Sequence, residues 1–183
     1  MESFAALRSP RLTLRPVSHA DVDAICGYRS LPEVARYQSW ETFEPGDAAA
    51  LVEAQAGLRP GVPGTWFQLA IVVSEPGTMA GDCGLHALPA AGQVELGITL
   101  SPAFWGCGYA MEAVTRLVDF VFGELNAHRV TAVTDAENER AAKLFARAGF
   151  RREAHFHENL WFKGRWGSEF VFALLRSQWE RAA

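Results

Sequence analysis

A strand, a glycine turn and a long amphipathic helix follow one another between residues 93 and 123, and this unit constrains the fold most. The segment QVELGITL, at 93–100, predicts a strand because it is largely apolar and contains β-branched residues. A helix is predicted after it because apolar residues recur at every third or fourth position. These residues are Ala110, Ala113, Val114, Leu117, Val118, Val121 and Phe122.

The loop from Trp105 to Ala110, which joins the two elements, has the features of an anion-binding site. Gly106 and Gly108 flank Cys107 at the predicted start of the helix, where glycine lets the backbone approach a ligand closely. The amides in the first turn of a helix have no partner within the helix and attract anions. The motif predicts a pyrophosphate site, although a tight turn without a ligand remains open on this motif alone.

Two other phosphate-binding motifs are excluded by the surrounding sequence. A dinucleotide-binding unit would place a third glycine at Met111 and would open a repeat of parallel strands. The strand of this unit is instead the last of three predicted antiparallel strands, and no GK[ST] sequence follows the loop.

The rest of the pattern predicts an α+β fold in one domain, residues 1–183. Ser18 and Asp21 have the spacing of a capping box at the start of a helix, and Gly149 suits the end of another. The remaining predicted strands are 11–17, 66–73, 79–88, 129–134, 154–162 and 168–175, with a turn at 163–167 and a helix at 45–58.

Composition narrows the class of protein. With 183 residues, of which 49% are hydrophobic, the chain can bury one substantial core. The net charge of -4 gives no basic surplus for nucleic acid. The three cysteines, Cys26, Cys83 and Cys107, form neither a disulfide framework nor a zinc motif, so we expect a reducing, cytoplasmic compartment and no metal. No apolar run has the length of a membrane span, and we expect no membrane association.

Four segments together resemble the GNAT acyltransferase superfamily, and within it the RimJ/RimL-like branch of protein N-terminal acetyltransferases. They are RLTLRP at 11–16, ELGITLSPAFWGCGYAMEA at 95–113, HRVTAVTDAEN at 128–138 and LFARAGF at 144–150. The resemblance implies a mixed, V-shaped sheet of about seven strands with helices on both faces. It also implies a split between the fourth and fifth strands that holds acetyl-CoA, and transfer of the acetyl group to a primary amine.

The same resemblance assigns the coenzyme contacts. The fourth strand would offer backbone groups of Ile98, Thr99 and Leu100 to the pantetheine and thioester. Asn138 would bind the pantetheine arm, although asparagine is also a common helix N-cap. Phe145 lies where many members carry a tyrosine that protonates the leaving thiolate. Amides of the loop would hold the pyrophosphate, from Trp105, Gly106, Cys107, Gly108, Tyr109, Ala110 and Met111.

Two further departures from the family pattern concern the proton that the leaving thiolate would take. Ala141 replaces a serine and Ser168 replaces an aspartate that are common in the branch. The proton for the thiolate would then come from Tyr109 or from water, or the thiolate would leave unprotonated.

Direct transfer requires a base that removes a proton from the acceptor ammonium. Glu95 is the first choice, provided that partial burial raises its pKa, and His86 and Asp82 are alternatives. His155 and His157 alternate on one strand and are interpreted as exposed imidazoles rather than a metal pair. Cys107 is interpreted as an inert small residue, with a mixed disulfide to coenzyme A as the alternative.

The acceptor side is less defined. The resemblance places five aromatic residues in loops or strands around the acceptor groove, and we expect most of them in the core and one or two in the cleft. They are Trp40, Phe43, Trp66, Trp161 and Trp166. A protein N-terminal α-amine is the first expectation, and a polyamine, amino acid or aminosugar is the second. A non-catalytic acyl-CoA-binding module is the third, and a monomer or homodimer is expected.

Overall fold

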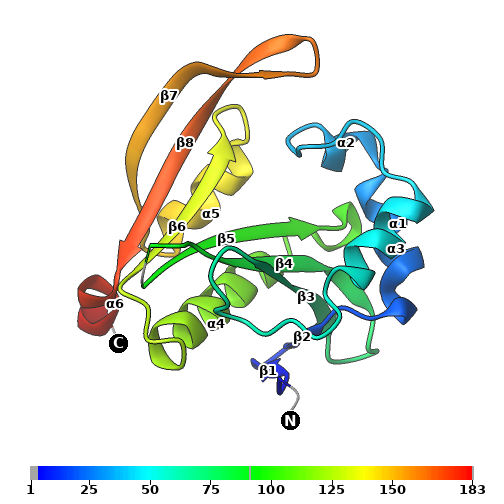
Figure 1. Ribbon diagram of the computed structural model, residues 1–183, viewed down its shortest axis with the longest axis horizontal. Helices are drawn as coiled ribbons and strands as arrows, with labels where there is room; N and C mark the ends of the chain where they lie inside the picture. The colour runs from blue at the N-terminus through cyan, green and yellow to red at the C-terminus, as the bar shows by residue number, and fades with distance from the viewer. Residues whose placement is uncertain (1–3, 91, 183) are drawn as a thin grey trace.

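The computed structural model describes residues 4–90 and 92–182, and this part of the chain forms one mixed sheet of eight strands flanked by helices (Figure 1). The strands are β1 (Leu7–Arg8), β2 (Leu12–Pro16), β3 (Trp66–Val73), β4 (Met79–Ala87), β5 (Gln93–Leu100), β6 (Arg129–Asp135), β7 (Arg151–Phe162) and β8 (Arg165–Leu175). The α-helices are α1 (Val22–Arg29), α2 (Pro32–Ala35), α3 (Pro45–Glu53), α4 (Tyr109–Gly123), α5 (Glu139–Arg147) and α6 (Arg176–Ala182).

The sheet is split between β5 and β6, which are the fourth and fifth strands of the implied pattern once the additional strand β1 is set aside. The strand order is β1-β2-β3-β4-β5-β6-β8-β7, and all neighbours are antiparallel except β5 and β6. Gln93–Glu95 of β5 pairs with Arg129–Thr131 of β6, and the pairing ends there. The rest of β5 therefore has no strand partner on its β6 side.

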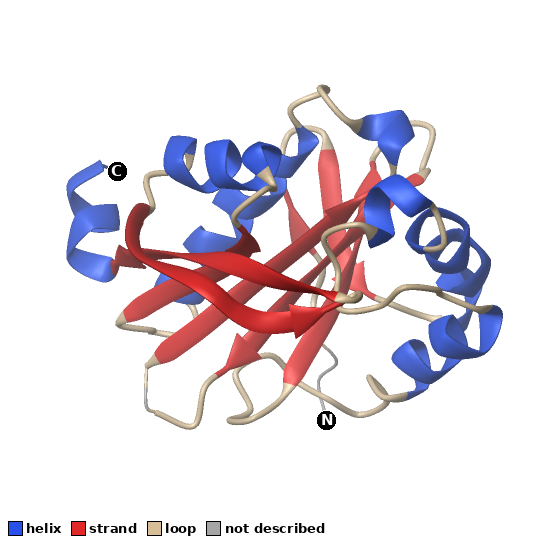
Figure 2. Cartoon of the chain, turned by 90° about the horizontal axis from the view of Figure 1, so that it is seen from above, coloured by secondary structure: helices blue, strands red, loops and turns tan. Residues whose placement is uncertain are grey.

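Helices cover the two faces of the sheet unequally (Figure 2). The larger core lies under α4 and α5, where Leu117 and Phe122 of α4 meet Leu69 and Leu85 of the sheet. Burial of each such side chain contributes roughly 1.5–3 kcal/mol to folding. The smaller core lies under α1 and α3 on the opposite face. That face is covered only over part of the sheet, which leaves room for a cleft.

Several boundaries differ from the sequence prediction. The turn predicted at 163–167 consists of Lys163 and Gly164 alone, whose positive φ angles of 50° and 75° suit a two-residue hairpin. β7 begins at Arg151 instead of 154, and the helix predicted at 45–58 ends at Glu53. The sequence pattern missed β1, α2 and α6 because they are too short to show a period. In the described part of the chain, no helix is both long and apolar enough to span a membrane.

Candidate functional site

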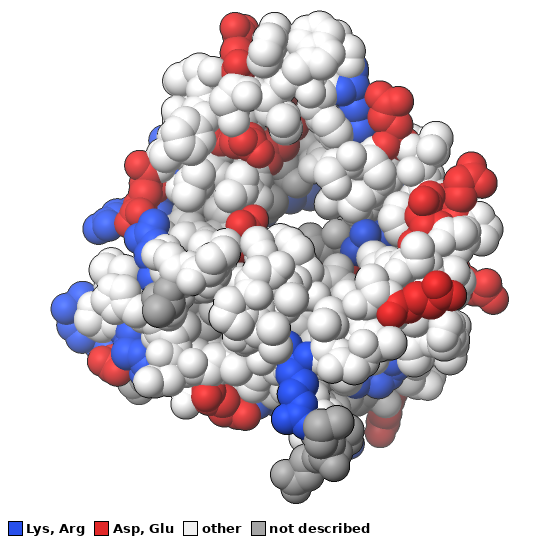
Figure 3. Space-filling view, in the orientation of Figure 1, with Lys and Arg blue, Asp and Glu red and all other residues white. Residues whose placement is uncertain are grey.

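A cleft of about 1070 Å³ opens where β5 and β6 separate, and it forms the hollow in the middle of the face shown in Figure 3. Its walls come from β3, β4 and β5 on one side and from β6, α5 and β8 on the other. Among the predicted site residues, the cleft is lined by Glu95, Ile98, Thr99, Asn138 and Phe145. Leu100 and the loop from Trp105 to Met111 do not line it.

The glycine loop leads directly from β5 into α4. Gly106 and Gly108 have φ angles of 77° and 83°, which glycine adopts without strain, and Gly108 is the residue that precedes α4. The indole N–H of Trp105 donates a hydrogen bond to the carbonyl of Leu100 at 3.0 Å, so the loop is fixed to the end of β5. The first-turn amides of α4 lie at the end of this turn, as the sequence predicted.

Arg11 fixes the other side of this loop, a role that the sequence interpretation missed. Its guanidinium donates to the Cys107 carbonyl at 3.0 Å and to the Glu112 carboxylate at 2.7 Å, and it lies 4.8 Å from the centre of the Tyr109 ring. Glu112 also accepts from the Ser9 hydroxyl. Burial raises the pKa of Glu112, but the hydrogen bonds from Ser9 and Arg11 outweigh it and lower the pKa. The available signal was the position of Arg11 in RLTLRP.

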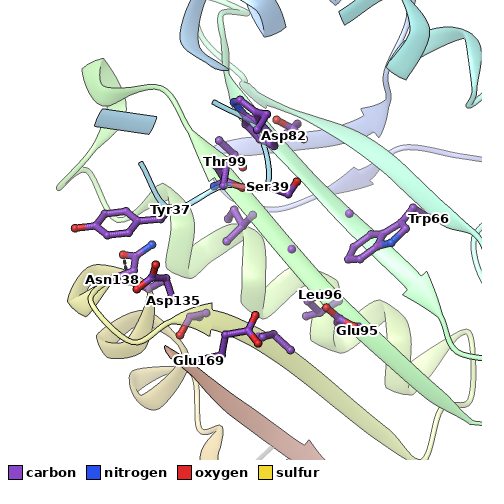
Figure 4. A pocket seen from close by; sticks show the side chains of 18 of the residues that line it. Tyr37, Ser39, Trp66, Asp82, Glu95, Leu96, Thr99, Asp135, Asn138 and Glu169 are labelled. Carbon is purple, nitrogen blue, oxygen red and sulfur yellow. Dashed lines mark hydrogen bonds between the residues drawn. The ribbon is translucent and has the colours of Figure 1, made fainter. Parts of the chain in front are cut away.

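The α5 side of the cleft contains the residues that depart from the family pattern. Asn138 caps α5, because its Oδ1 accepts from the Ala141 N–H at 3.1 Å, and its side chain lines the cleft (Figure 4). Phe145 is 3% exposed and packs against Phe150 and Phe172. The Ser168 hydroxyl accepts a hydrogen bond from the backbone N–H of Glu158. The N-cap interpretation of Asn138 is therefore confirmed.

Glu95 lies on β5 at the last residue that pairs with β6, at the point where the cleft begins. It is half-buried, and His86 lies directly opposite it on β4. Burial raises the pKa of Glu95, His86 lowers it, and the charge of Glu169 across the cleft raises it, so that the net pKa is above its usual value. The carboxyl groups of Glu95 and Glu169 both face the cleft in Figure 4.

Asp82 is a member of a buried ionic cluster, which makes it unsuitable as the base. It is 1% exposed and accepts hydrogen bonds from the Tyr28 hydroxyl, the Arg29 guanidinium and the Gln68 amide. The Arg29 guanidinium in turn lies 4.6 Å from the centre of the Trp40 ring. The carboxylate has no free position for a substrate proton, so the sequence interpretation of Asp82 as an alternative base is wrong.

The aromatic residues divide into two groups. Trp40 and Trp66 line the cleft, and Phe43 packs against Trp40 with ring centres 5.2 Å apart. Trp161 and Trp166 do not line it: they are 61% and 55% exposed on the β7–β8 hairpin, where they contact each other. One or two aromatic residues were expected in the cleft, and Trp40 and Trp66 are there, but the expectation that the others lie in the core is wrong for Trp161 and Trp166.

Four other candidate residues do not line the cleft. The rings of His155 and His157 contact each other on β7, and within residues 4–90 and 92–182 no group of three or more possible ligands could hold a metal ion. Cys107 is exposed, with its Sγ 3.7 Å from the Trp105 carbonyl oxygen. The Tyr109 ring faces Arg11 and does not line the cleft, so Tyr109 is poorly placed as a proton donor there.

The tip of the β7–β8 hairpin bridges the cleft. Lys163 donates a hydrogen bond to the Ala35 carbonyl at the end of α2. Next to it, Glu137 accepts two hydrogen bonds from Arg165, at 2.8 and 3.0 Å, and lies 3.6 Å from Arg36. The hairpin tip and the end of α2 are therefore joined across the cleft.

Comparison with known proteins gives consistent matches over most of the chain. The family profile described as "Acetyltransferase (GNAT) domain" matches residues 11–151. The uncharacterized N-acetyltransferase p20 of Bacillus licheniformis is 31% identical over 175 residues, which cover 94% of this chain and 97% of that protein. YdaF of Bacillus subtilis, named as a ribosomal N-acetyltransferase, is 28% identical over 105 residues, or 57% of each chain. The structure of spermidine N-acetyltransferase from Vibrio cholerae, in complex with CoA and spermine, matches with a TM-score of 0.82 at 21% identity, over 94% of this chain and 99% of that one.

Proposed function

Because the chain belongs to the GNAT family of acetyl-CoA-dependent N-acetyltransferases, we propose that it transfers the acetyl group directly to a cationic primary amine. The charge of the cleft is the observation that supports a cationic acceptor. Its lining contains the carboxyl groups of Asp82, Glu95, Asp135 and Glu169 and a single guanidinium, that of Arg29. Since Arg29 is paired with Asp82, three carboxyl groups remain to attract a cation.

The coenzyme fits the groups that the fold leaves available. Beyond Glu95 the β6-facing backbone of β5 has no strand partner, so Ile98–Leu100 can bind the pantetheine arm. The pyrophosphate would bind to the amides of Trp105–Met111, where the loop is fixed by Leu100 and Arg11. Asn138 still has its side-chain N–H group for the pantetheine, and Phe145 would pack against it without donating a proton.

The chemistry assigns one proton to Glu95. The carboxylate takes a proton from the ammonium, directly or through water, and the neutral amine attacks the thioester carbonyl. The new C–N bond forms as the C–S bond breaks, the electron pair leaves with sulfur, and the nitrogen releases its second proton to water. Phe145 and Ala141 have no proton to give, so the thiolate leaves as such and takes its proton from water.

Two acceptor classes follow from different observations. The RimJ/RimL-like sequence pattern and the similarity to YdaF support a protein N-terminal α-amine. The carboxyl groups of Glu95, Asp135 and Glu169 support a small di- or polyamine, because each added positive charge on the acceptor is attracted to the cleft. The charge of the cleft favours the second class.

The test is a thiol-release screen with acetyl-CoA, in which N-terminal peptides and small amines are compared. We expect release of free coenzyme A with at least one class, and a much lower kcat in Glu95→Gln. If the protein binds acetyl-CoA but releases no thiol with any amine, the proposal is wrong and a non-catalytic binding module is supported. Unchanged turnover in Glu95→Gln would exclude Glu95 as the base.

A further inference from the structure

The Trp66 indole lines the cleft on its β3 side. Its ring lies parallel to the His86 ring, with centres 4.9 Å apart and planes 15° apart. The indole remains 41% exposed and lines the cleft next to Glu95 (Figure 4). One face of the indole is therefore covered by His86, and the other is available to a ligand.

Two glycines make room for this indole. Gly84 of β4 and Gly97 of β5 are directly opposite each other on the cleft floor. A Cβ atom at Gly84 would lie 2.8 Å from Trp66 Cε3, closer than such atoms approach, and one at Gly97 would lie 3.5 Å from Trp66 Cζ3. The edge of the indole thus rests on backbone where any larger residue at position 84 would displace it.

Gln68 presents an unpaired acceptor above the same floor. Its Nε2 donates to Asp82 at 2.7 Å, which fixes the orientation of the side-chain amide. Its Oε1 is buried, and no partner for it exists among the described residues. The oxygen is also close to the position that a Cβ of Gly84 would take, beside the indole. A buried carbonyl oxygen without a donor costs free energy that a ligand N–H group would recover.

The sheet register sets the distance between this oxygen and the base. Trp66, His86 and Glu95 form one row across β3, β4 and β5, and Gln68, Gly84 and Gly97 form the next row on the same face. Gln68 and Glu95 are thus two strands and two residues apart, which separates their Cα atoms by about 12 Å. An acceptor that reaches both side chains therefore needs a second N–H group well separated from the reacting amine, as an extended diamine has.

We propose that Trp66 and Gln68 form a subsite for the second nitrogen of a di- or polyamine acceptor. This inference rests on the proposed function and deepens it. The free face of Trp66 packs on the methylene chain and on the ammonium group, and Gln68 Oε1 accepts one N–H hydrogen bond from the second nitrogen. The first amine then lies at the Glu95 end of the cleft.

The test compares hexamethylenediamine with hexylamine, which have the same reactive amine and differ in the second nitrogen. Thiol release gives KM values, and calorimetry with the CoA-bound protein gives Kd values that do not require turnover. We expect wild-type protein to prefer the diamine about tenfold in Kd, the effect of roughly one charge-assisted hydrogen bond. Gln68→Leu removes the preference, and Trp66→Leu raises Kd for both amines about tenfold.

Gly84→Ala should weaken the binding of both amines and also reduce the diamine preference, because a Cβ there meets Gln68 Oε1 as well as the indole. Gly123→Ala, where an added Cβ in α4 meets open space, is the matched control and leaves both amines unaffected. The KM of acetyl-CoA stays constant in all four variants. The proposal is overturned if wild-type protein shows no preference for the diamine, or if Gln68→Leu retains it. A third arm of the experiment compares the binding of a dipeptide amide that has a free peptide N–H with one in which that nitrogen is methylated.

The outcomes separate this subsite from the proposed function. If the dipeptide depends on its peptide N–H and the diamine is not preferred, the diamine assignment is wrong. If no amine is turned over but the diamine binds and depends on Gln68, the subsite stands and the proposed activity fails. If amines are turned over with no dependence on Trp66 or Gln68, the activity stands and the subsite fails.

Discussion

Glu95 combines the two properties that a base in this position requires. It lies where the sheet splits, and partial burial raises the pKa of its carboxyl group, with a further contribution from the charge of Glu169. A higher pKa makes the carboxylate a stronger proton acceptor, yet it must still be ionised at the working pH. The sequence predicted Glu95 as the base from its place on the strand before the loop, and the structure adds its partial burial.

The pH profile tests this role. We predict that kcat rises with pH through the raised pKa of Glu95, and that Glu95→Gln loses about two orders of magnitude in kcat together with that rise.

The folded protein holds the Glu95 proton more tightly than the unfolded chain, so this group stabilises below its unfolded pKa, and the contribution is lost as pH rises through the folded pKa. Glu95→Gln is therefore no less stable than wild type at neutral pH. A lower melting temperature there would contradict the assignment.

We expect Asp82 to stabilise the folded protein, so its substitution should lower the free energy of unfolding. Removing one partner of a buried ion pair leaves the other charged, so we predict that Asp82→Ala loses about 3–5 kcal/mol of unfolding free energy. Chemical denaturation measures this loss. Glu139→Ala, which breaks an exposed pair with Lys143, is the control and should leave the denaturation midpoint unchanged. Equal effects of the two substitutions would show that the Asp82 cluster does not stabilise the fold.

At the scale of elements, Arg11 connects the start of β2 to the loop before α4. We predict that Arg11→Ala raises the KM of acetyl-CoA several-fold and leaves the KM of the amine unchanged, because the loop loses its hydrogen bond at Cys107. Steady-state kinetics with each substrate varied in turn measures this difference. Arg116→Ala, on the outer side of α4, is the matched control. An equal rise in both KM values would indicate a general loss of structure.

The Arg11–Glu112 pair should make the stability of the folded protein depend on pH. The folded-state pKa of Glu112 is lowered, so its contribution to stability is present above the unfolded pKa and is lost as pH falls through the folded pKa. Glu112→Gln should therefore reduce the loss of stability in acid. This comparison uses thermal melts at several acidic pH values.

The elements that could be predicted are those with a long local period. α4 was predicted because its apolar residues recur over four turns, and β3 to β5 because short turns separate apolar runs. The bounds of β7 and β8 were wrong because most of β7 is exposed and shows no alternation of apolar residues. α2 has four residues, too few for a pattern.

The residues of the candidate site also divide into those with a local sequence signal and those without one. The glycine loop and Glu95 lie within one continuous segment, and Asn138 has a local capping signal, so the local structure at all three could be predicted. The Arg29–Asp82 pair joins residues 53 positions apart, and the Arg11–Glu112 pair joins residues 101 positions apart. Pairings over such distances depend on the register of the sheet and on helix packing, which a single sequence does not encode locally.

At the scale of the whole molecule, we expect the bridge between the hairpin tip and α2 to restrict access to the cleft. It joins β8 and α2 through Lys163, Arg165 and Glu137. We predict that Lys163→Ala lowers the KM of peptide acceptors and leaves that of small diamines unchanged, because only bulky acceptors meet the bridge. Kinetics with a peptide and a diamine on the same preparation measures this. Lys143→Ala, on the exposed side of α5, is the control, and a change in neither acceptor would show that the bridge does not restrict entry.

The measurement that tests direct transfer most simply is intact-mass and product analysis of the wild-type protein with acetyl-CoA, with and without a diamine. Direct transfer predicts an acetylated diamine in amounts equal to the coenzyme A released, and no acetyl group on the protein when the diamine is absent. An acetylated protein formed without acceptor, at Cys107 or elsewhere, would contradict direct transfer, as would release of coenzyme A without an acetylated amine.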